Sequence, residues 1–206
     1  MDKKFFLYFI VSLLLTSCGS RSVKNINSRG KNIVCFGDSI TYGLGASPGH
    51  DYPSLLAKKL NLTVINAGKS GDTTEGALQR IQHDVLDKKP YLVIVELGAN
   101  DYLKGISAET TLKNLEEIIR KIQQAGAMVA ITEIHTGFIM KKQASGIRKL
   151  ARKYRCLFIP NILEGILGEE ELCSDAIHPN DKGYEIIAER VYRAIKPLIA
   201  RRLSQR

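Results

Sequence analysis

The stretch "YLVIVELG" (residues 91–98) decides the fold class, because nearly every side chain in it is apolar. A strand of this composition must be covered on both faces, as the strands of parallel sheets are. Four further runs are also short and nearly continuous in apolar residues: "NIVCFG" (32–37), "LTVINA" (62–67), "AMVAITE" (127–133) and "CLFIP" (156–160). We therefore predict a five-stranded parallel sheet that is buried on both faces.

Amphipathic stretches separate these runs. In "AETTLKNLEEIIRKIQQAG" (108–126), apolar residues recur every three or four positions, which is typical of a helix with one buried face. The stretches that we expect to be helical are Tyr52–Leu60, Glu75–Lys88, Ala108–Ala125, Ile139–Tyr154 and Asn180 to about Leu203. This alternation predicts one α/β domain, a doubly wound three-layer sandwich with right-handed crossovers. In such sheets the active site lies beyond the carboxyl ends of the strands.

The first residues, "MDKKFFLYFIVSLLLTSC" (1–18), differ from the rest of the chain. The apolar run from Phe5 to Leu15 is too short to span a bilayer, since a spanning helix needs roughly 20 residues. We therefore interpret residues 1–17 as a secretory signal peptide, to be set apart from the fold. The segment ends in Leu15-Thr16-Ser17-Cys18, which resembles the cleavage box of bacterial lipoproteins. That resemblance implies an exported protein whose lipidated Cys18 anchors it to a membrane, facing the periplasm or the cell exterior.

Residues 18–31 are mostly small and polar and carry four cations but no acid. We interpret them as a tether near an anionic lipid surface, and residues 32–206 as the folded domain. The formal net charge of the 206-residue chain is +9, but its Lys and Arg residues are scattered and no nucleic-acid recognition motif accompanies them. We therefore expect a membrane partner, no nucleic acid, and a monomer.

The cysteines do not form a recognisable framework. Lipidation of Cys18 would leave three others, which cannot all pair within one chain. Cys35 lies in an apolar run, where a small buried core residue is expected. The sequence leaves open whether Cys156 and Cys173 form a disulfide, because it holds no distance between them. No cysteine–histidine grouping has the spacing of zinc ligands, so we expect neither a metal nor a cofactor.

Four polar loops follow predicted strands or precede the last helix: "GDSITYGLG" (37–45), "GKSGDTTEG" (68–76), "GANDYLKG" (98–105) and "SDAIHPNDKGY" (174–184). Ser39 fits a nucleophile, because hydrolysis of an acyl bond needs a hydroxyl at a fixed turn. Asp175 and His178 are three residues apart, so one turn can hold the carboxylate against an imidazole base. The backbone N–H of Gly71 and the amide of Asn100 are suitable donors to the charge that develops on the carbonyl oxygen.

Together these loops resemble the four sequence blocks of the SGNH (GDSL) hydrolase family. The blocks are Gly-Asp-Ser at 37–39, "NAGKSGDT" (66–73), Gly-Ala-Asn-Asp at 98–101 and Asp-Ala-Ile-His at 175–178, and the resemblance covers about residues 32–200. The stretches "VINAGKSGDTT" (64–74) and "LVIVELGANDYLKG" (92–105) are most similar to the bacterial branch of multifunctional thioesterases, lysophospholipases and arylesterases. The resemblance implies a flavodoxin-like α/β/α sandwich with a five-stranded parallel sheet.

The same resemblance implies Ser39 as nucleophile, His178 as base and Asp175 as the partner of the base. The oxyanion hole would consist of three donors: the N–H groups of Ser39 and Gly71 and the side-chain amide of Asn100. Gly68 is the alternative to Gly71. An α/β-hydrolase fits less well, because "GDSIT" (37–41) lacks the final glycine of that fold's nucleophile motif.

The loop after the fourth strand, "EIHTGFIMKKQASG" (133–146), is shorter than the substrate loop of the similar branch, so the sequence indicates the reaction better than the substrate. As contacts to an acyl chain we predict four residues at the edge of the site: Leu103, Ile134, His135 and Ile177. We expect a serine esterase that acts on lysophospholipids or simple carboxylic esters, with thioesters as a side activity. Two alternatives are a carbohydrate O-acetyl esterase and a catalytically silent binding module on the same fold.

Overall fold

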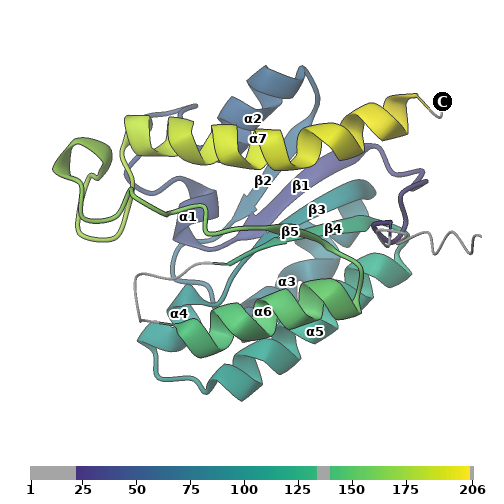
Figure 1. Ribbon diagram of the computed structural model, residues 1–206, viewed down its shortest axis with the longest axis horizontal. Helices are drawn as coiled ribbons and strands as arrows, with labels where there is room; N and C mark the ends of the chain where they lie inside the picture. Colours follow the sequence, from purple (N-terminus) through teal and green to yellow (C-terminus); the bar gives the residue numbers. More distant parts are fainter. Residues whose placement is uncertain (1–21, 134–139, 205–206) are drawn as a thin grey trace, which may run out of the picture.

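The computed structural model describes residues 22–133 and 140–204. Five parallel strands form one sheet in the order β2-β1-β3-β4-β5 (Figure 1). They are β1 (Asn32–Gly37), β2 (Val64–Gly68), β3 (Pro90–Glu96), β4 (Met128–Thr132) and β5 (Leu157–Ile159). Because β1 lies between β2 and β3, the strand order reverses next to β1, which makes the carboxyl end of β1 the expected place for a site.

Helices cover both faces of the sheet (Figure 1). One face carries α2 (Tyr52–Leu60) and α7 (Asp181–Leu203), and the other carries α3 (Thr74–Asp84), α5 (Ala108–Gln124) and α6 (Lys141–Lys153). Shorter helical pieces lie in the connections: α1 (Ser39–Tyr42), α4 (Ala99–Leu103), and the 3₁₀ turns η1 (Leu86–Lys88) and η2 (Glu170–Leu172). The predicted three-layer α/β/α sandwich is confirmed.

The central strand β3 explains why its sequence is apolar without a break. All seven of its residues are buried. Leu92 and Ile94 pack into the core on the α2–α7 side, and Val93 and Val95 pack into the core on the α3–α5–α6 side. Side chains alternate between the faces of a strand, so a sheet with helices on both faces requires apolar residues at every position.

Several element boundaries differ from the predictions. The helix predicted over Glu75–Lys88 ends at Asp84 and continues as η1, after which Lys89 takes a left-handed conformation with φ 51°. The short helices α1 and α4 were not predicted, because they hold polar loop residues and are too short to show an apolar period.

The described part of the predicted tether, residues 22–31, packs on the domain. Val23 and Ile26 contact the core on the α2–α7 side. Further along the segment, the Arg202 guanidinium donates to the carbonyl of Gly30 at 2.7 Å. The predicted signal peptide and Cys18 lie outside the described residues. Within the described ranges, no helix is long and apolar enough to cross a membrane.

Cys35, Cys156 and Cys173 all carry free thiols. The Cys35 side chain is fully buried, as expected for a core residue. Cys173 donates to the carbonyl of Ile166 at 3.2 Å. The pairing of Cys156 and Cys173 that the sequence left open is therefore not formed in this structure.

Candidate active site

The candidate nucleophile lies in a tight connection between β1 and α1. Asp38 caps the helix, since its Oδ1 accepts from the backbone N–H of Ile40 at 3.1 Å. Ser39 is the first residue of α1, so its own N–H has no partner within the helix and remains available. Gly37 has no room for a side chain, because a Cβ there would collide with the Thr41 hydroxyl and the Glu96 carbonyl. The strand end, the turn and the helix therefore hold Ser39 in one place.

The loop before α7 brings the candidate base to this serine. His178 Nε2 lies 3.1 Å from Ser39 Oγ, although the two residues are 139 positions apart in the chain. On the other side of the ring, Nδ1 lies 2.8 Å from Asp175 Oδ2 and 3.0 Å from Oδ1. This carboxylate thus holds the imidazole with Nε2 toward the serine, which is the arrangement that lets Nε2 accept a proton.

The Asp175 carboxylate is itself fixed by the backbone of its own turn. Its Oδ1 accepts from the N–H groups of Ile177 and His178, both at 2.9 Å. The hydrogen bonds from the Ile177 N–H and the His178 ring hold the pKa of Asp175 at about 2, below its ordinary value. A further backbone bond from Ser174 N–H to the His178 carbonyl, at 2.9 Å, closes the turn. Asp175 is therefore a carboxylate at neutral pH.

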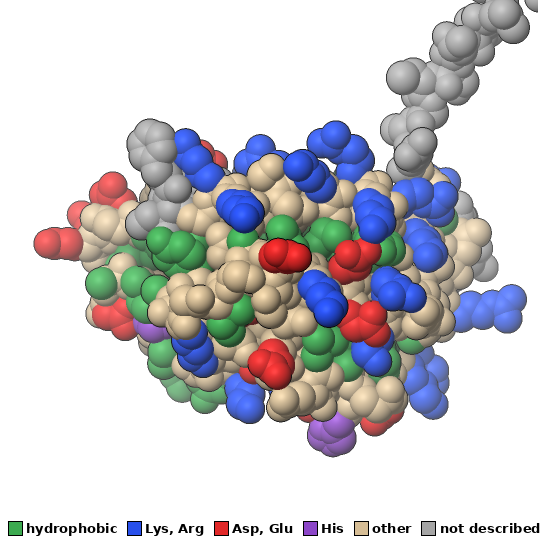
Figure 2. All heavy atoms as spheres, turned by 90° about the horizontal axis from the view of Figure 1, so that it is seen from below, with side chains coloured by type: hydrophobic (Ala, Val, Ile, Leu, Met, Phe, Trp, Pro, Cys, Tyr) green, Lys and Arg blue, Asp and Glu red, His purple; other side chains and the backbone are tan. Residues whose placement is uncertain are grey.

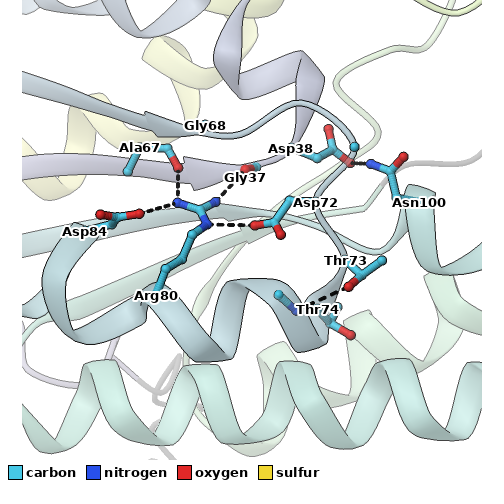
Figure 3. Close-up of polar contacts among 12 residues, drawn as sticks. Gly37, Asp38, Ala67, Gly68, Asp72, Thr73, Thr74, Arg80, Asp84 and Asn100 are labelled. Carbon is cyan, nitrogen blue, oxygen red and sulfur yellow. Dashed lines mark hydrogen bonds and ion pairs between the residues drawn. The ribbon is translucent and has the colours of Figure 1, made fainter.

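Asn100 projects from α4 at the carboxyl end of β3, and its amide is oriented by the nucleophile turn. Asn100 Nδ2 donates to Asp38 Oδ2 at 3.0 Å (Figure 3). A primary amide has two N–H bonds, so this contact leaves the second one available to a substrate. The next residue, Asp101, accepts from the backbone N–H of Thr74 at 2.9 Å and thereby joins α4 to the start of α3.

Of the two glycines considered as the second backbone donor, the structure favours Gly71. Gly71 lines the same pocket as Ser39, Asn100 and His178. Its φ is +72°, a left-handed conformation that suits glycine. The N–H of Gly68 is already bound to Asn66 Oδ1 at 2.9 Å. Gly68 is therefore excluded as the donor.

Arg80, on α3, holds the ends of two strands and the Gly71 loop together (Figure 3). Its Nε donates to Asp72 at 2.7 Å, and its two terminal nitrogens donate to the carbonyls of Ala67 and Gly37 at 2.9 and 3.0 Å. Asp84 completes the set at 3.0 Å. One guanidinium thus connects the residue before the Asp38 turn with the residue after Gly71. Arg80 was not predicted from the sequence, although a cation between Ala77 and Ile81 on the buried face of the helix is unusual.

Two acidic side chains lie buried beneath the nucleophile turn. Asp38 is 1% exposed and Glu96 is fully buried. Glu96 Oε2 accepts from the Thr41 hydroxyl at 2.8 Å and from its N–H at 3.2 Å, whereas Oε1 has no hydrogen-bond partner among the described residues. Burial raises the pKa of Asp38 to about 6, and burial together with the Asp38 charge raises the pKa of Glu96 well above its ordinary value. Both effects favour the neutral form of Glu96. This role of Glu96 was not predicted from the sequence either.

A cavity of about 360 Å³ opens over Ser39 and is lined mainly by apolar side chains. Two predicted contacts, Leu103 and Ile177, line it, and they are 65% and 50% exposed. The other two, Ile134 and His135, lie outside the described residues. Among the apolar lining residues that were not predicted, three belong to a segment after β5 and to the start of α6: Leu163, Leu167 and Met140.

Comparison with known proteins agrees with this geometry. The model of the GDSL-like Lipase/Acylhydrolase family matches residues 35–186. Esterase TesA of Pseudomonas aeruginosa is 29% identical over 199 residues, which cover 91% of this chain and 99% of TesA. Thioesterase 1/protease 1/lysophospholipase L1 of Escherichia coli K12 is 30% identical over 175 residues, which cover 81% of this chain and 84% of that protein.

Among solved structures, the psychrotrophic esterase EstA from Pseudoalteromonas sp. superposes with a TM-score of 0.76. It is 28% identical in sequence, and the match covers 82% of this chain and 99% of EstA. The family model spans well over half of the chain and includes every predicted catalytic residue. The resemblance in the four sequence blocks is therefore confirmed: the chain belongs to the GDSL-like lipase/acylhydrolase family, the SGNH hydrolases, and is a carboxylic ester hydrolase.

Proposed function

We propose that the protein is a serine esterase in which Ser39 is the nucleophile, His178 the base and Asp175 the partner that orients the base. The observation that carries the proposal is the 3.1 Å contact between Ser39 Oγ and His178 Nε2. Two segments at opposite ends of the domain sequence meet there with the imidazole already held by a carboxylate. A silent binding module on the same fold would not need this arrangement.

In the first half of the reaction, Ser39 Oγ attacks the carbonyl carbon of the ester and gives its proton to His178 Nε2. The carbonyl oxygen becomes negative in the tetrahedral intermediate. We assign the stabilising donors to the Ser39 N–H, the Gly71 N–H and the second N–H of Asn100. When the intermediate collapses, the bond to the alcohol breaks, and His178 gives its proton to the leaving oxygen.

In the second half, water replaces the alcohol. His178 takes a proton from the water as the water oxygen attacks the acyl-serine carbon, and the same donors hold the second oxyanion. Collapse of this intermediate breaks the bond to Ser39 Oγ, which regains its proton from His178. The products are one alcohol and one carboxylic acid. The complete reaction consumes one water molecule and needs no redox partner.

For the substrate, we propose acyl esters with an apolar acyl group, including lysophospholipids and simple carboxylic esters, with acyl thioesters as a side activity. The largely apolar cavity over Ser39 supports this choice. The name of the Escherichia coli relative joins thioesterase and lysophospholipase activities, which is consistent with it. A carbohydrate O-acetyl esterase is the alternative, and it would release acetate in preference to longer acids.

We also propose that the protein is exported and anchored through a lipid on Cys18. The support is the arrangement of the N-terminal residues: an apolar run of signal-peptide length that ends in Leu-Thr-Ser-Cys at 15–18. Metabolic labelling with a fatty acid analogue, lost in Cys18→Ala, tests this part on its own.

The central experiment compares Ser39→Ala with Ser145→Ala, a matched change at an exposed serine on α6. Hydrolysis of short p-nitrophenyl esters and labelling by a fluorophosphonate probe should both be lost in Ser39→Ala and retained in Ser145→Ala. Unchanged hydrolysis in Ser39→Ala would reject the assignment. A series of esters from acetyl to long-chain then separates the acyl esterase from the O-acetyl esterase.

A further inference from the structure

The N-terminal segment is fixed at the amino ends of the strands. The Asn25 side chain donates to the carbonyls of Gln123 and Ala127, at 2.8 and 2.9 Å, directly before β4. The backbone N–H of Lys24 donates to the carbonyl of Arg155, just before β5. The chain therefore enters the described structure at this edge of the sheet, which we call the amino edge.

The active site lies at the opposite edge. Ser39 follows β1, Gly71 follows β2 and Asn100 follows β3 (Figure 1). A strand advances about 3.3 Å per residue, so the strands separate the two edges by roughly 20 Å. The direction from the amino edge to the opening of the site is thus the direction of the strands.

The two edges also differ in charge. Exposed cations surround the amino edge: Lys24, Arg29, Lys31, Lys89, Arg155 and Arg201. Two of them, Arg29 and Lys89, line a hollow of about 590 Å³ there. Among the described residues, the exposed acid near this edge is Asp87, which accepts from Gln82. In Figure 2, Lys and Arg are spread over the visible face, and several of them lie at the right-hand end, which is the amino edge.

The site edge carries exposed apolar groups and charges of both signs. Its acids include Glu169, Glu170, Glu171 and Asp175, and its exposed cations are Lys69, Lys104, Lys141, Lys142 and Lys182. Acidic and hydrophobic side chains are prominent at the left-hand end of Figure 2. Anionic phospholipids attract clustered Lys and Arg near a membrane surface, so the charge pattern favours the amino edge as the side that contacts such a bilayer.

We propose that the amino edge faces the anionic bilayer to which Cys18 is attached, and that the active site opens away from that bilayer. This inference rests on the proposed function, including the lipid on Cys18. Four residue steps from Cys18 to Ser22 reach at most about 14 Å, whatever their conformation. That reach is shorter than the separation of the two edges, so the site cannot turn to the anchoring bilayer while residues 23–26 stay packed. The substrates are then esters that approach from the aqueous side, not lipids of the enzyme's own membrane.

The test uses the lipidated full chain in phosphatidylglycerol vesicles that also hold a non-exchanging fluorogenic long-chain ester. A variant with about 30 Gly and Ser residues inserted between Arg21 and Ser22 has a tether of roughly 30 Å root-mean-square length. We expect this variant to hydrolyse the ester in its own bilayer at least tenfold faster than the unaltered protein, and a soluble short-chain ester at an equal rate. Equal rates on the bilayer ester would overturn the orientation. Loss of the soluble activity in both proteins would instead overturn the proposed function.

The long-tether variant also isolates the role of charge. In it, only attraction to the lipid holds the amino edge down, so replacing phosphatidylglycerol by phosphatidylcholine should raise its rate on the bilayer ester severalfold. Reversing three cations of the segment, Lys24→Glu, Arg29→Glu and Lys31→Glu, should remove this lipid dependence. A control with the same change in net charge, Lys113→Glu, Lys142→Glu and Lys149→Glu on α5 and α6, should retain it. The same response from both triple variants would contradict the assignment of the amino edge.

Discussion

The proposed nucleophile, Ser39, and its proposed base, His178, are held in contrasting ways. Asp38 and Glu96, beneath Ser39, are buried, and the turn around them is fixed by packing and by hydrogen bonds from distant segments. The Asp175 side chain is 55% exposed, and the base loop is fixed by bonds within a few residues of itself. The contrast predicts that changes on the base side affect catalysis alone, whereas changes on the nucleophile side affect catalysis and folding together.

The largest effect is expected from the base. His178→Ala should lower kcat by about 10⁶-fold, the loss typical of removing the base of a catalytic triad. The thermal midpoint should change little, because the turn is closed by backbone bonds that the substitution leaves in place. Steady-state hydrolysis of a p-nitrophenyl ester and thermal unfolding measure the two effects. His83→Ala is the control, since this histidine is 82% exposed on α3. If His178→Ala destabilised the fold as much as we expect Arg80→Ala to do, the contrast between the two sides of the site would not hold.

On the nucleophile side, Arg80→Ala should lower both the catalytic rate and the stability of the fold. It leaves Asp72, whose side chain is 4% exposed, without its cation, and breaking a buried pair in this way costs about 3–5 kcal/mol of unfolding free energy. Because Asp72 adjoins Gly71, kcat should also fall by up to about 100-fold, as for a misplaced oxyanion donor. Denaturant unfolding and ester hydrolysis are the measurements.

The matched control for Arg80 is Arg193→Ala. Arg193 pairs with Glu189 at 2.6 Å, but its side chain is 78% exposed. Exposed pairs of this kind contribute at most about 1 kcal/mol. If Arg80 acts by positioning the Gly71 loop, added guanidinium should restore part of the kcat of Arg80→Ala and leave its KM unchanged. Equal losses in the two variants would show that Arg80 does not hold the site together.

The buried Glu96 should make the stability of the fold depend on pH. Burial raises the pKa of Glu96 well above its ordinary value, so the folded protein keeps a proton that the unfolded chain releases as the pH rises. Stability is therefore lost with rising pH, by up to about 1.4 kcal/mol per pH unit between pH 5 and 7. Glu96→Gln is neutral in both states and removes this loss. Its unfolding free energy should match that of the unaltered protein near pH 5 and exceed it at pH 7. A constant difference across this range would mean that Glu96 is ionised in the fold.

The sequence predicted some parts of the fold and of the candidate site and not others. The strands and the four loops were predictable, because an apolar run such as Tyr91–Val95 has one physical explanation and because polar loops at strand ends converge in a doubly wound sheet. The contact of Ser39 with His178 and Asp175 could be anticipated because Asp175 and His178 are close in sequence and Ser39 follows a strand; their catalytic roles stay a prediction.

Arg80 and Glu96 could not be assigned in that way. Arg80 acts on groups from β1, β2 and the Gly71 loop, and only the folded arrangement brings these to one side chain. Glu96 did leave a signal, since an acid at the end of a buried strand is costly unless it is neutral or paired. The apolar wall from Leu163 and Leu167 was missed because that segment has no regular period and depends on the path of the chain after β5.

The smallest effects are expected from substitutions on the two sides of the cavity over Ser39. Leu103 reaches it from α4, next to Asn100, and Ile177 reaches it from the base loop, next to His178. Both are at least half exposed, so Leu103→Ser and Ile177→Ser should each lower kcat/KM for long-chain esters by about tenfold or less, and leave acetyl esters nearly unchanged. Leu203→Ser, at the far end of α7 and 55% exposed, is the control for loss of an exposed apolar side chain.

Since the base loop is fixed by hydrogen bonds within itself, Ile177→Ser should act only on chain-length preference. A fall in acetyl ester hydrolysis in that variant would mean that the loop depends on the cavity wall for its shape, and the two sides of the site would then be less independent than their contacts indicate.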